Sequence, residues 1–396
     1  MLLDKIKELA DRYAEETVTA RRHLHAHPEL SYEEYETAKF VTNKLKSLGL
    51  QPTEGIAGTG VVALIEGKNP NQRVVALRAD MDALPIQETG SSAYKSVHPG
   101  VMHACGHDVH TASLLTTARI LTEIKDAFEG SVKLIFQPGE EKNPGGASLM
   151  IKAGVLDNPR PAAILGQHVM PLVPAGKVGF REGMYMASSD EIYLTVVGKG
   201  GHGASPDLAI DPVVIASHII IGLQQVISRN ASPKQPTVLT FGRVIAEGAT
   251  NIIPNEVKIA GTFRALNETW RAQGLEKIQK MAEGIAESMG GKCIVEISHG
   301  YPYLENDREL TARIRRAAEE YLGKENVVDI DLTLGSEDFA YYSHQVPASF
   351  YRLGTRNDAR GITSFVHTSN FDIDEEALRI GPGMMAWLAV NELMKK

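Results

Sequence analysis

Cysteine is scarce in this chain, which has only Cys105 and Cys293 among its 396 residues. One disulfide is possible, but so few cysteines fit a reducing compartment better, and we expect a cytoplasmic protein. An excess of basic residues is also missing, because 41 Lys and Arg are outnumbered by 49 Asp and Glu, which gives a formal net charge of −8. Without a basic stripe, a nucleic-acid partner is not expected.

The chain also lacks long apolar stretches. No uninterrupted apolar run of about 18 residues occurs, so we expect no membrane-spanning segment. The first residues, "MLLDKIKELADRYAEE", have the spacing of an amphipathic helix and lack the apolar core and cleavage site of a signal peptide. With 43% hydrophobic and 23% charged residues, the composition is that of a soluble globular protein, and the length favours two domains.

Apolar strands alternate with helices over much of the chain, which predicts an α/β fold with a mainly parallel central sheet flanked by helices. Strands are expected in "GVVALIEG", "RVVALRAD", "SVKLIFQPGEE" and "AAILGQHV", and "TASLLTTARILTEI" has helical spacing. Residues 1–49 are expected to be helical with a break at "HAHPELS", where Pro28 ends one helix and Ser31 caps the next.

The order of elements changes near Arg181. The next part of the chain follows the order strand, helix, strand, strand, helix, strand, which is the ferredoxin-like α+β arrangement. Its helix "DPVVIASHIIIGLQQVISR" has Pro212 in the first turn, and this helix and the strand edges offer a surface for dimerisation. We therefore expect a catalytic domain of residues 1–184 and 299–396, with an inserted lid or dimerisation domain at residues 185–298.

Side chains that can bind metals follow several of the predicted strands. They are Asp80 and Asp82 in "LRADMDALP", Glu140 and Glu141 in "IFQPGEE", His168 in "LGQHV" and His367 in "VHTSNF", with Cys105 and His107 in "VMHACGHDVH". In open α/β sheets ligands bind at the carboxyl ends of the strands, so these side chains are expected to converge on one crevice. Cysteine, histidine and carboxylate together suit a borderline-soft divalent ion such as Zn²⁺, Ni²⁺, Co²⁺ or Mn²⁺.

A cysteine nucleophile is the competing interpretation of "VMHACGHDVH". His107 would be the base for Cys105, and the helix that follows would lower the pKa of the thiol. That interpretation leaves Glu140, Glu141 and the two other histidines of the set without roles. A two-metal site uses them all, so we favour the metal site.

Eight motifs occur in order and cover nearly the whole chain: "RRHLHAHPELSYEEYETAKFV", "RADMDALP", "MHACGHDVHTASLL", "FQPGEE", "GHGASP", "TNIIPNEVKIAGTFRA", "GSEDFAYY" and "HTSNFDIDEEAL". With them the sequence resembles the M20 metallopeptidase family, subfamily D. That group contains aminoacylases, hippurate hydrolases, N-acetyl-diaminopimelate deacetylases and indole-acetyl-amino-acid hydrolases.

The resemblance implies a centre of two divalent metal ions, either Zn, Mn, Ni or Co. Its ligands would be Cys105, His107, Glu141, His168 and His367. Glu140 matches the general base, and Asp82 would orient a metal-binding histidine from outside the ligand set. The wider family has a histidine ligand at the position of Asp80, and here Cys105 would supply a ligand instead. Subfamily members often have Ala at the position of Gly139, and we expect the glycine to loosen the turn.

The inserted domain contributes further candidates through the same resemblance. His202, from the inserted domain of a partner subunit, would stabilise the tetrahedral intermediate. Asn251 and Arg264 are candidates for binding the substrate carboxylate. Asp108 and His110 are expected to support the metal site from outside.

The predicted function is metal-dependent hydrolysis of the amide bond of N-acyl amino acids or small peptides. A metal-bridging water would attack, with Glu140 as general base and then general acid. The expected partners are a small-molecule substrate and a second copy of the chain, in a homodimer. A carboxypeptidase or dipeptidase is the alternative. A non-catalytic binder of amino-acid conjugates is another, although a binder has no need of a free base.

Overall fold

The structure is a computed structural model that describes residues 1–395, and the chain divides into two compact units. Unit 1 comprises Met1–Gly183, Glu305–Asp331 and Asp338–Lys396, and unit 2 comprises Met184–Leu304 and Leu332–Glu337. Unit 2 is therefore inserted between segments of unit 1. A two-stranded sheet pairs β7 (Gly183–Met186) with β14 (Leu304–Asn306), where the chain passes from one unit to the other.

The large sheet of unit 1 has eight strands in the order β1-β2-β4-β3-β5-β16-β6-β15. Their bounds are β1 (Thr53–Ile56), β2 (Gly60–Glu66), β3 (Val74–Asp80), β4 (Ser131–Gln137), β5 (Ala163–Pro174), β6 (Val178–Phe180), β15 (Val327–Asp329) and β16 (Ala348–Arg356). The central strands β4, β3, β5 and β16 are parallel, and the pairs β1–β2, β2–β4 and β16–β6 are antiparallel. The predicted sheet with a parallel centre is thus confirmed.

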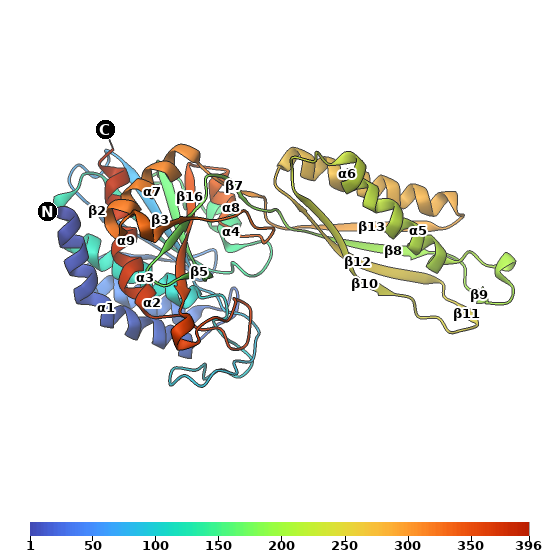
Figure 1. Cartoon of the computed structure of the whole chain (residues 1–396), viewed down its shortest axis with the longest axis horizontal. Helices are drawn as coiled ribbons and strands as arrows, with labels where there is room; N and C mark the ends of the chain where they lie inside the picture. Colours follow the sequence, from blue (N-terminus) through green and yellow to red (C-terminus); the bar gives the residue numbers. More distant parts are fainter. Residues whose placement is uncertain (396) are drawn as a thin grey trace. The chain divides into compact units, whose positions relative to one another are not determined.

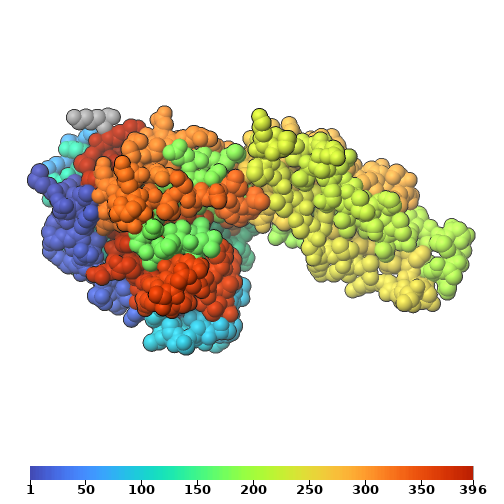
Figure 2. Space-filling view, viewed as in Figure 1, coloured from blue at the N-terminus to red at the C-terminus, as the bar shows by residue number. Residues whose placement is uncertain are grey.

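Helices cover this sheet because its central strands are apolar and fully buried; every residue of β3 and β4 is buried. The helices of unit 1 are α1 (Leu2–Ala26), α2 (Tyr35–Ser47), α3 (His107–Glu123), α4 (Gly146–Lys152), α7 (Arg308–Leu322), α8 (Ala340–Ser343) and α9 (Glu376–Leu393). α3 and α9 pack on β3, and α1 packs against both of them (Figure 1). Residues from the two ends of the chain, blue and red in Figure 2, therefore share one surface of unit 1.

The break after the first helix differs from the prediction. α2 begins only at Tyr35, and its N-cap residue is Glu34, so Ser31 does not cap this helix. The Ser31 hydroxyl instead donates a hydrogen bond to Asp82 Oδ2 at 2.7 Å. The capping prediction was wrong because this buried serine has a partner far away in the sequence.

Unit 2 contains a four-stranded antiparallel sheet in the order β10-β12-β8-β13, with two helices. Its main elements are β8 (Asp190–Val197), α5 (Pro212–Gln225), β10 (Thr237–Ile245), β12 (Glu256–Ala265), α6 (Glu268–Ser288) and β13 (Lys292–His299). The chain order and the strand order are those of a ferredoxin-like fold, as predicted. A separate ribbon pairs β9 (Gly201–His202) with β11 (Ile252–Ile253).

The helix α5 begins at Pro212, and the Asp211 carboxylate accepts hydrogen bonds from the first helical amides, so local capping fixes its start. With the π-helical turn after it, the helix spans Pro212–Asn230, which is long and apolar enough to cross a membrane by length and composition. One such helix is weak evidence for a span, and one face of α5 packs on β12 and α6 of unit 2.

Candidate metal centre

Three neighbouring parallel strands bring acidic and histidine side chains to one edge of the large sheet. Asp80 is the last residue of β3, which runs parallel to both β4 and β5. Arg78 pairs with Gly166 of β5, so His168 lies at the level of Asp80. The pair Glu140–Glu141 follows the end of β4 at Gln137 after Pro138 and Gly139. The acidic residues therefore lie where the strand-end rule predicts, whereas His168 lies inside β5, which continues to Pro174.

The loop before α3 carries Cys105 to the same edge. Gly106, the N-cap residue of α3, has a φ of 83°, and a Cβ atom there would lie 2.6 Å from a methyl carbon of Val169. A glycine is needed at this point because the loop approaches β5 so closely. The approach puts Cys105 Sγ at 3.4 Å from His168 Nε2.

His367 reaches the centre from a loop near the C-terminus. Its backbone has a φ of 62°, and its amide donates to the carbonyl of Ala104 at 2.7 Å. Its Nε2 lies 3.3 Å from Cys105 Sγ and 3.2 Å from Glu141 Oε1. A left-handed backbone at a non-glycine residue is costly and often marks a functional position.

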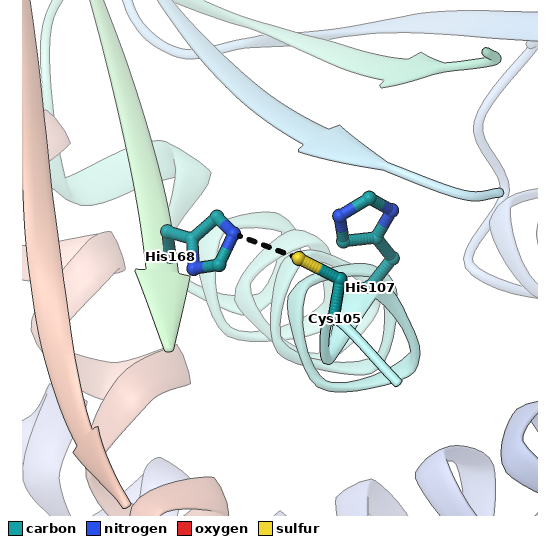
Figure 3. A group of neighbouring side chains, drawn as sticks. All are labelled: Cys105, His107 and His168. Atoms are coloured by element: carbon teal, nitrogen blue, oxygen red, sulfur yellow. Dashed lines mark hydrogen bonds between the residues drawn. The ribbon is translucent and has the colours of Figure 1, made fainter. Parts of the chain in front are cut away.

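All five residues predicted as metal ligands come together in overlapping groups. One group is Cys105, His107 and His168, drawn in Figure 3, and another is Cys105, Glu141 and His367. In each group the possible ligand atoms lie within 4.8 Å of one another. Cys105 belongs to both groups, so two ions held by these groups would share it as a ligand.

In His107 and His168, hydrogen bonds at Nδ1 leave a lone pair on Nε2, the nitrogen available to a metal ion. His107 Nδ1 lies 3.1 Å from Asp82 Oδ1, and His168 Nδ1 lies 2.8 Å from the carbonyl oxygen of Val169. Because these oxygens only accept, the proton of each neutral ring is on Nδ1 and the lone pair is on Nε2. His107 Nε2 is buried without a hydrogen-bond partner within residues 1–395, and Glu141 Oε1 faces His367 Nε2 at 3.2 Å. An unsatisfied buried atom such as His107 Nε2 fits a metal ligand well.

Electrostatics at His107 agree with a site built for cations. Burial opposes protonation, but Asp80, Asp82 and Glu141 raise the pKa of His107 to about 10. A divalent cation can take the place of this proton among the same carboxylates.

The surroundings of Cys105 argue against a nucleophilic thiol. Burial raises the pKa of Cys105 well above its usual value, and Glu141, Glu140 and Asp80 raise it further. A nucleophilic cysteine needs the opposite shift, from a neighbouring cation or a helix N-terminus. Coordination to a metal ion removes this difficulty, because the ion itself stabilises the thiolate.

Asp80 and His110 form a pair with each other, and both lie close enough to His107 to make a third possible group of ligands. His110 Nδ1 lies 2.5 Å from Asp80 Oδ1, and His110 Nε2 accepts from the amide of Val169 at 2.9 Å. Burial works against ionisation of Asp80, but Arg78 and the nearby histidines hold its pKa well below the usual value. The pair thus joins α3 to the sheet from outside the ligand set.

Asp338 is a buried site residue to which the sequence assigned no role. Arg78 Nη2 donates to its Oδ1 at 2.7 Å, Gln137 Nε2 donates to both oxygens, and the Ala147 amide donates to Oδ2 at 2.9 Å. Its own amide donates to Glu140 Oε1 at 3.4 Å. The acidic "GSEDF" motif was the available signal, but its partners are distant in the sequence.

The three candidates in unit 2 do not form one cluster. His202 and Asn251 are neighbours on the ribbon of β9 and β11, because the Gly203 amide donates to the Asn251 carbonyl at 2.9 Å. Arg264 is near the end of β12, whereas the ribbon lies beyond the start of that strand (Figure 1). At about 3.3 Å per residue, Arg264 is roughly 26 Å from Glu256, the first residue of β12. Asn251 and Arg264 of one copy therefore cannot hold one carboxylate together.

Comparisons with known proteins agree with this geometry. The model of the family described as Peptidase family M20/M25/M40 matches residues 76–391. An N-acyl-L-amino acid amidohydrolase of Geobacillus stearothermophilus is 42% identical over 301 residues, which are 76% of this chain and 80% of that protein. Thermostable carboxypeptidase 2 of Saccharolobus solfataricus is 37% identical over 393 residues, 98% of each chain.

A solved structure from Bacillus subtilis, described as a dinuclear metal binding peptidase from the M20 family, has the same fold. It matches with a TM-score of 0.83 and 36% identity, over 96% of this chain and 99% of that one. The family match covers well over half of the chain, and the relatives match along most of their own length. The chain therefore belongs to peptidase family M20/M25/M40 and is a hydrolase of that family.

Proposed function

We propose that this enzyme hydrolyses the amide bond of N-acyl amino acids with two divalent metal ions, held by Cys105, His107, Glu141, His168 and His367. The observation that carries the proposal is the state of the ligand atoms. Two imidazoles have their Nδ1 protons fixed by hydrogen bonds, and the buried Nε2 of His107 has no hydrogen-bond partner among residues 1–395. The amidohydrolase named above supports the substrate class.

Glu140 is the residue proposed to move the proton. When bound, two divalent ions polarise the scissile carbonyl and lower the pKa of the attacking water. Glu140 takes a proton from this water and delivers it to the leaving amine, so that a carboxylate and a free amino acid are released. The amide of Asp338 donates to Glu140 Oε1, and Glu140 Oε2 lies 4.0 Å from His107 Nε2. These contacts direct the carboxylate toward the metal ligands.

The ligand set limits the choice of ion and of compartment. A thiolate with imidazoles and carboxylates favours Zn²⁺, Mn²⁺, Ni²⁺ or Co²⁺ over Mg²⁺ and Ca²⁺, which prefer oxygen ligands alone. Cys105 can bind a metal only as a reduced thiolate, and both Cys105 and Cys293 are free thiols. We therefore propose a reducing, cytoplasmic setting.

His202 is proposed as the donor that stabilises the tetrahedral intermediate. Its Nδ1 accepts from the Ala204 amide at 3.0 Å, so the neutral ring carries its proton on Nε2. The exposed side chain thus presents its Nε2 N–H as a donor. If Asn251 and Arg264 both bind the substrate carboxylate, they must come from different copies of the chain, since one copy holds them far apart.

A homodimer supplies such a second copy. α5 exposes Val214 at 46% and Ile221 at 73%, which leaves apolar side chains on the face opposite the sheet of unit 2. Burial of this face against a second α5 would stabilise a dimer. Ile221→Glu should then produce monomers in analytical ultracentrifugation, whereas a wild-type protein that is already monomeric would reject the dimer.

A carboxypeptidase acting on short peptides is the second candidate, because the relative from Saccharolobus solfataricus carries that name. Both reactions break an amide bond next to a free carboxylate, so the metal centre alone does not distinguish them. The experiment is a panel of N-acetyl, benzoyl and indole-acetyl amino acids and of dipeptides, each assayed after reconstitution with the four candidate ions. Faster hydrolysis of dipeptides than of every acyl amino acid would overturn the first proposal.

A further inference from the structure

The aromatic ring of Tyr32 lies directly against the backbone of Gly139, the residue before Glu140. Gly139 has a φ of 59°, and a Cβ atom there would come within 2.3 Å of the ring carbon Cε1 of Tyr32. Tyr32 itself has a φ of 69°, a conformation that residues other than glycine adopt only where their surroundings impose it. From the sequence we expect Gly139 to loosen the turn. In the structure this glycine instead permits the close contact with the Tyr32 ring.

The hydroxyl of Tyr32 contacts the far side of the same loop. It donates to the carbonyl of Lys142 at 2.7 Å and accepts from the amide of Gly145 at 3.1 Å. The ring contact at Gly139 and the hydroxyl bonds thus lie before and after the pair Glu140–Glu141. One side chain holds the loop on both sides of the proposed base.

Glu34 ties the turn that carries Tyr32 to the loop. Its Oε1 accepts from the amides of Tyr32 at 2.9 Å and of Gly139 at 2.8 Å, and its Oε2 accepts from Thr59 Oγ1 at 2.5 Å. Tyr32 lies two residues before Glu34 in the same turn. It is therefore fixed both by its backbone amide and by its hydroxyl. Because Glu34 is fully buried, these hydrogen bonds are shielded from water.

We propose that Tyr32 is a positioning residue that sets the place of Glu140 relative to the metal ligands, and that Gly139 is required because the ring occupies the space of a side chain. The inference rests on the proposed function, since Glu140 is the base only in that reaction. A base must lie within hydrogen-bond reach of the water proton, and a displacement of about 1 Å can cost a rate on the order of 100-fold.

Three variants separate the contacts. Tyr32→Phe keeps the ring and loses the hydroxyl bonds, and it should lower kcat about tenfold with KM and bound metal unchanged. Gly139→Ala brings a methyl group against the ring and should lower kcat on the order of 100-fold. In a Tyr32→Ala background the ring is gone and only the strain of the left-handed backbone remains, which Gly49→Ala also introduces, so adding Gly139→Ala should lower kcat by less than about threefold. Tyr35→Phe, at an exposed tyrosine, and Gly49→Ala, at a φ of 80° with open space, are the matched controls.

Hydrogen exchange of the metal-free protein supplies a readout that needs no activity. The Gly145 amide donates both to the Tyr32 hydroxyl at 3.1 Å and to the Lys142 carbonyl at 3.0 Å. Tyr32→Phe removes the first acceptor and frees the Lys142 carbonyl from the hydroxyl, so it should accelerate exchange of this amide, while Tyr35→Phe should not. Unchanged exchange in Tyr32→Phe, or an equal loss of kcat from Gly139→Ala with and without the ring, would overturn the inference. A wild-type protein that hydrolyses no substrate, combined with faster exchange in Tyr32→Phe, would overturn the proposed function and leave the clamping of this loop intact.

Discussion

Replacing Asp82 by asparagine tests how the carboxylate outside the ligand set controls metal binding. Asp82 Oδ1 faces His107 Nδ1 at 3.1 Å, and its Oδ2 accepts from Ser31 Oγ at 2.7 Å and from the Glu141 amide at 2.9 Å. Two of its neighbours are thus metal ligands in the proposed centre. The change keeps the size of the side chain and removes the charge.

The size of the effect follows from the donors around Asp82. Asparagine has one oxygen and one NH₂ group, so in either orientation the NH₂ group faces an N–H donor, of His107 or of Glu141. A buried donor left unpaired costs about 1–3 kcal/mol. The lost charge also weakens the basicity and orientation of His107, and losses of such supporting partners lower metal affinity by about 10–100-fold. That range equals about 1.4–2.7 kcal/mol of binding free energy.

The assay is competition with a chelator of known affinity, which gives the metal Kd of the wild-type and Asp82→Asn proteins at the same pH. Asp126→Asn, at an exposed position, is the control for loss of one carboxylate charge. A Kd for Asp82→Asn within about twofold of the control would refute the reasoning, because His107 and Glu141 would then bind the ion without their supporting partner.

Three further predictions concern the base, the metal ligand His107 and the inserted unit. Glu140→Gln should lower kcat by about 10²–10⁴ with an unchanged number of bound ions, and full turnover in this variant would reject the base. The pKa of His107 is raised from 6.5 to about 10 without metal, so the stabilisation it gives the chelated protein is complete below pH 6.5 and is lost as pH rises through 10. Thermal melts of the chelated wild-type and His107→Gln proteins should therefore converge with rising pH, and a constant difference would contradict this shift. If His202 acts across the dimer, each mixed dimer of a His202→Ala and a Glu140→Ala chain has one complete site of two. An equimolar mixture, in which about half of the dimers are mixed, should then recover about a quarter of wild-type activity, whereas no recovery would place His202 within one chain.

Much of the fold and the composition of the ligand set could be predicted from the sequence, because both depend on local patterns. The buried parallel strands β3 and β4 contain short apolar runs, "VVAL" and "LIF", and the ferredoxin-like order appears directly as alternating strands and helices. The rule that ligands bind at strand ends then selects Glu141 without knowledge of distances, whereas His168 lies inside the long strand β5.

The supporting contacts could not be predicted in the same way, because their partners are distant in the chain. Ser31 has the sequence context of a helix cap, yet its hydroxyl bonds Asp82, and α2 starts later. Asp338 looks like an ordinary loop acid, but it accepts from Arg78 on β3. The glycine at position 139 suggests a looser turn from the sequence, but the ring of Tyr32 packs against it in the structure. Each case depends on tertiary packing that overrides a local preference.

The most direct test of the metal centre is a titration of the chelated protein with Mn²⁺ or Zn²⁺, in which bound ions per chain and hydrolysis of an N-acetyl amino acid are measured together. We predict no activity without metal and full activity at two ions per chain. Activity that survives complete removal of metal but is abolished by a thiol reagent would contradict the metal centre and return Cys105 to the role of nucleophile.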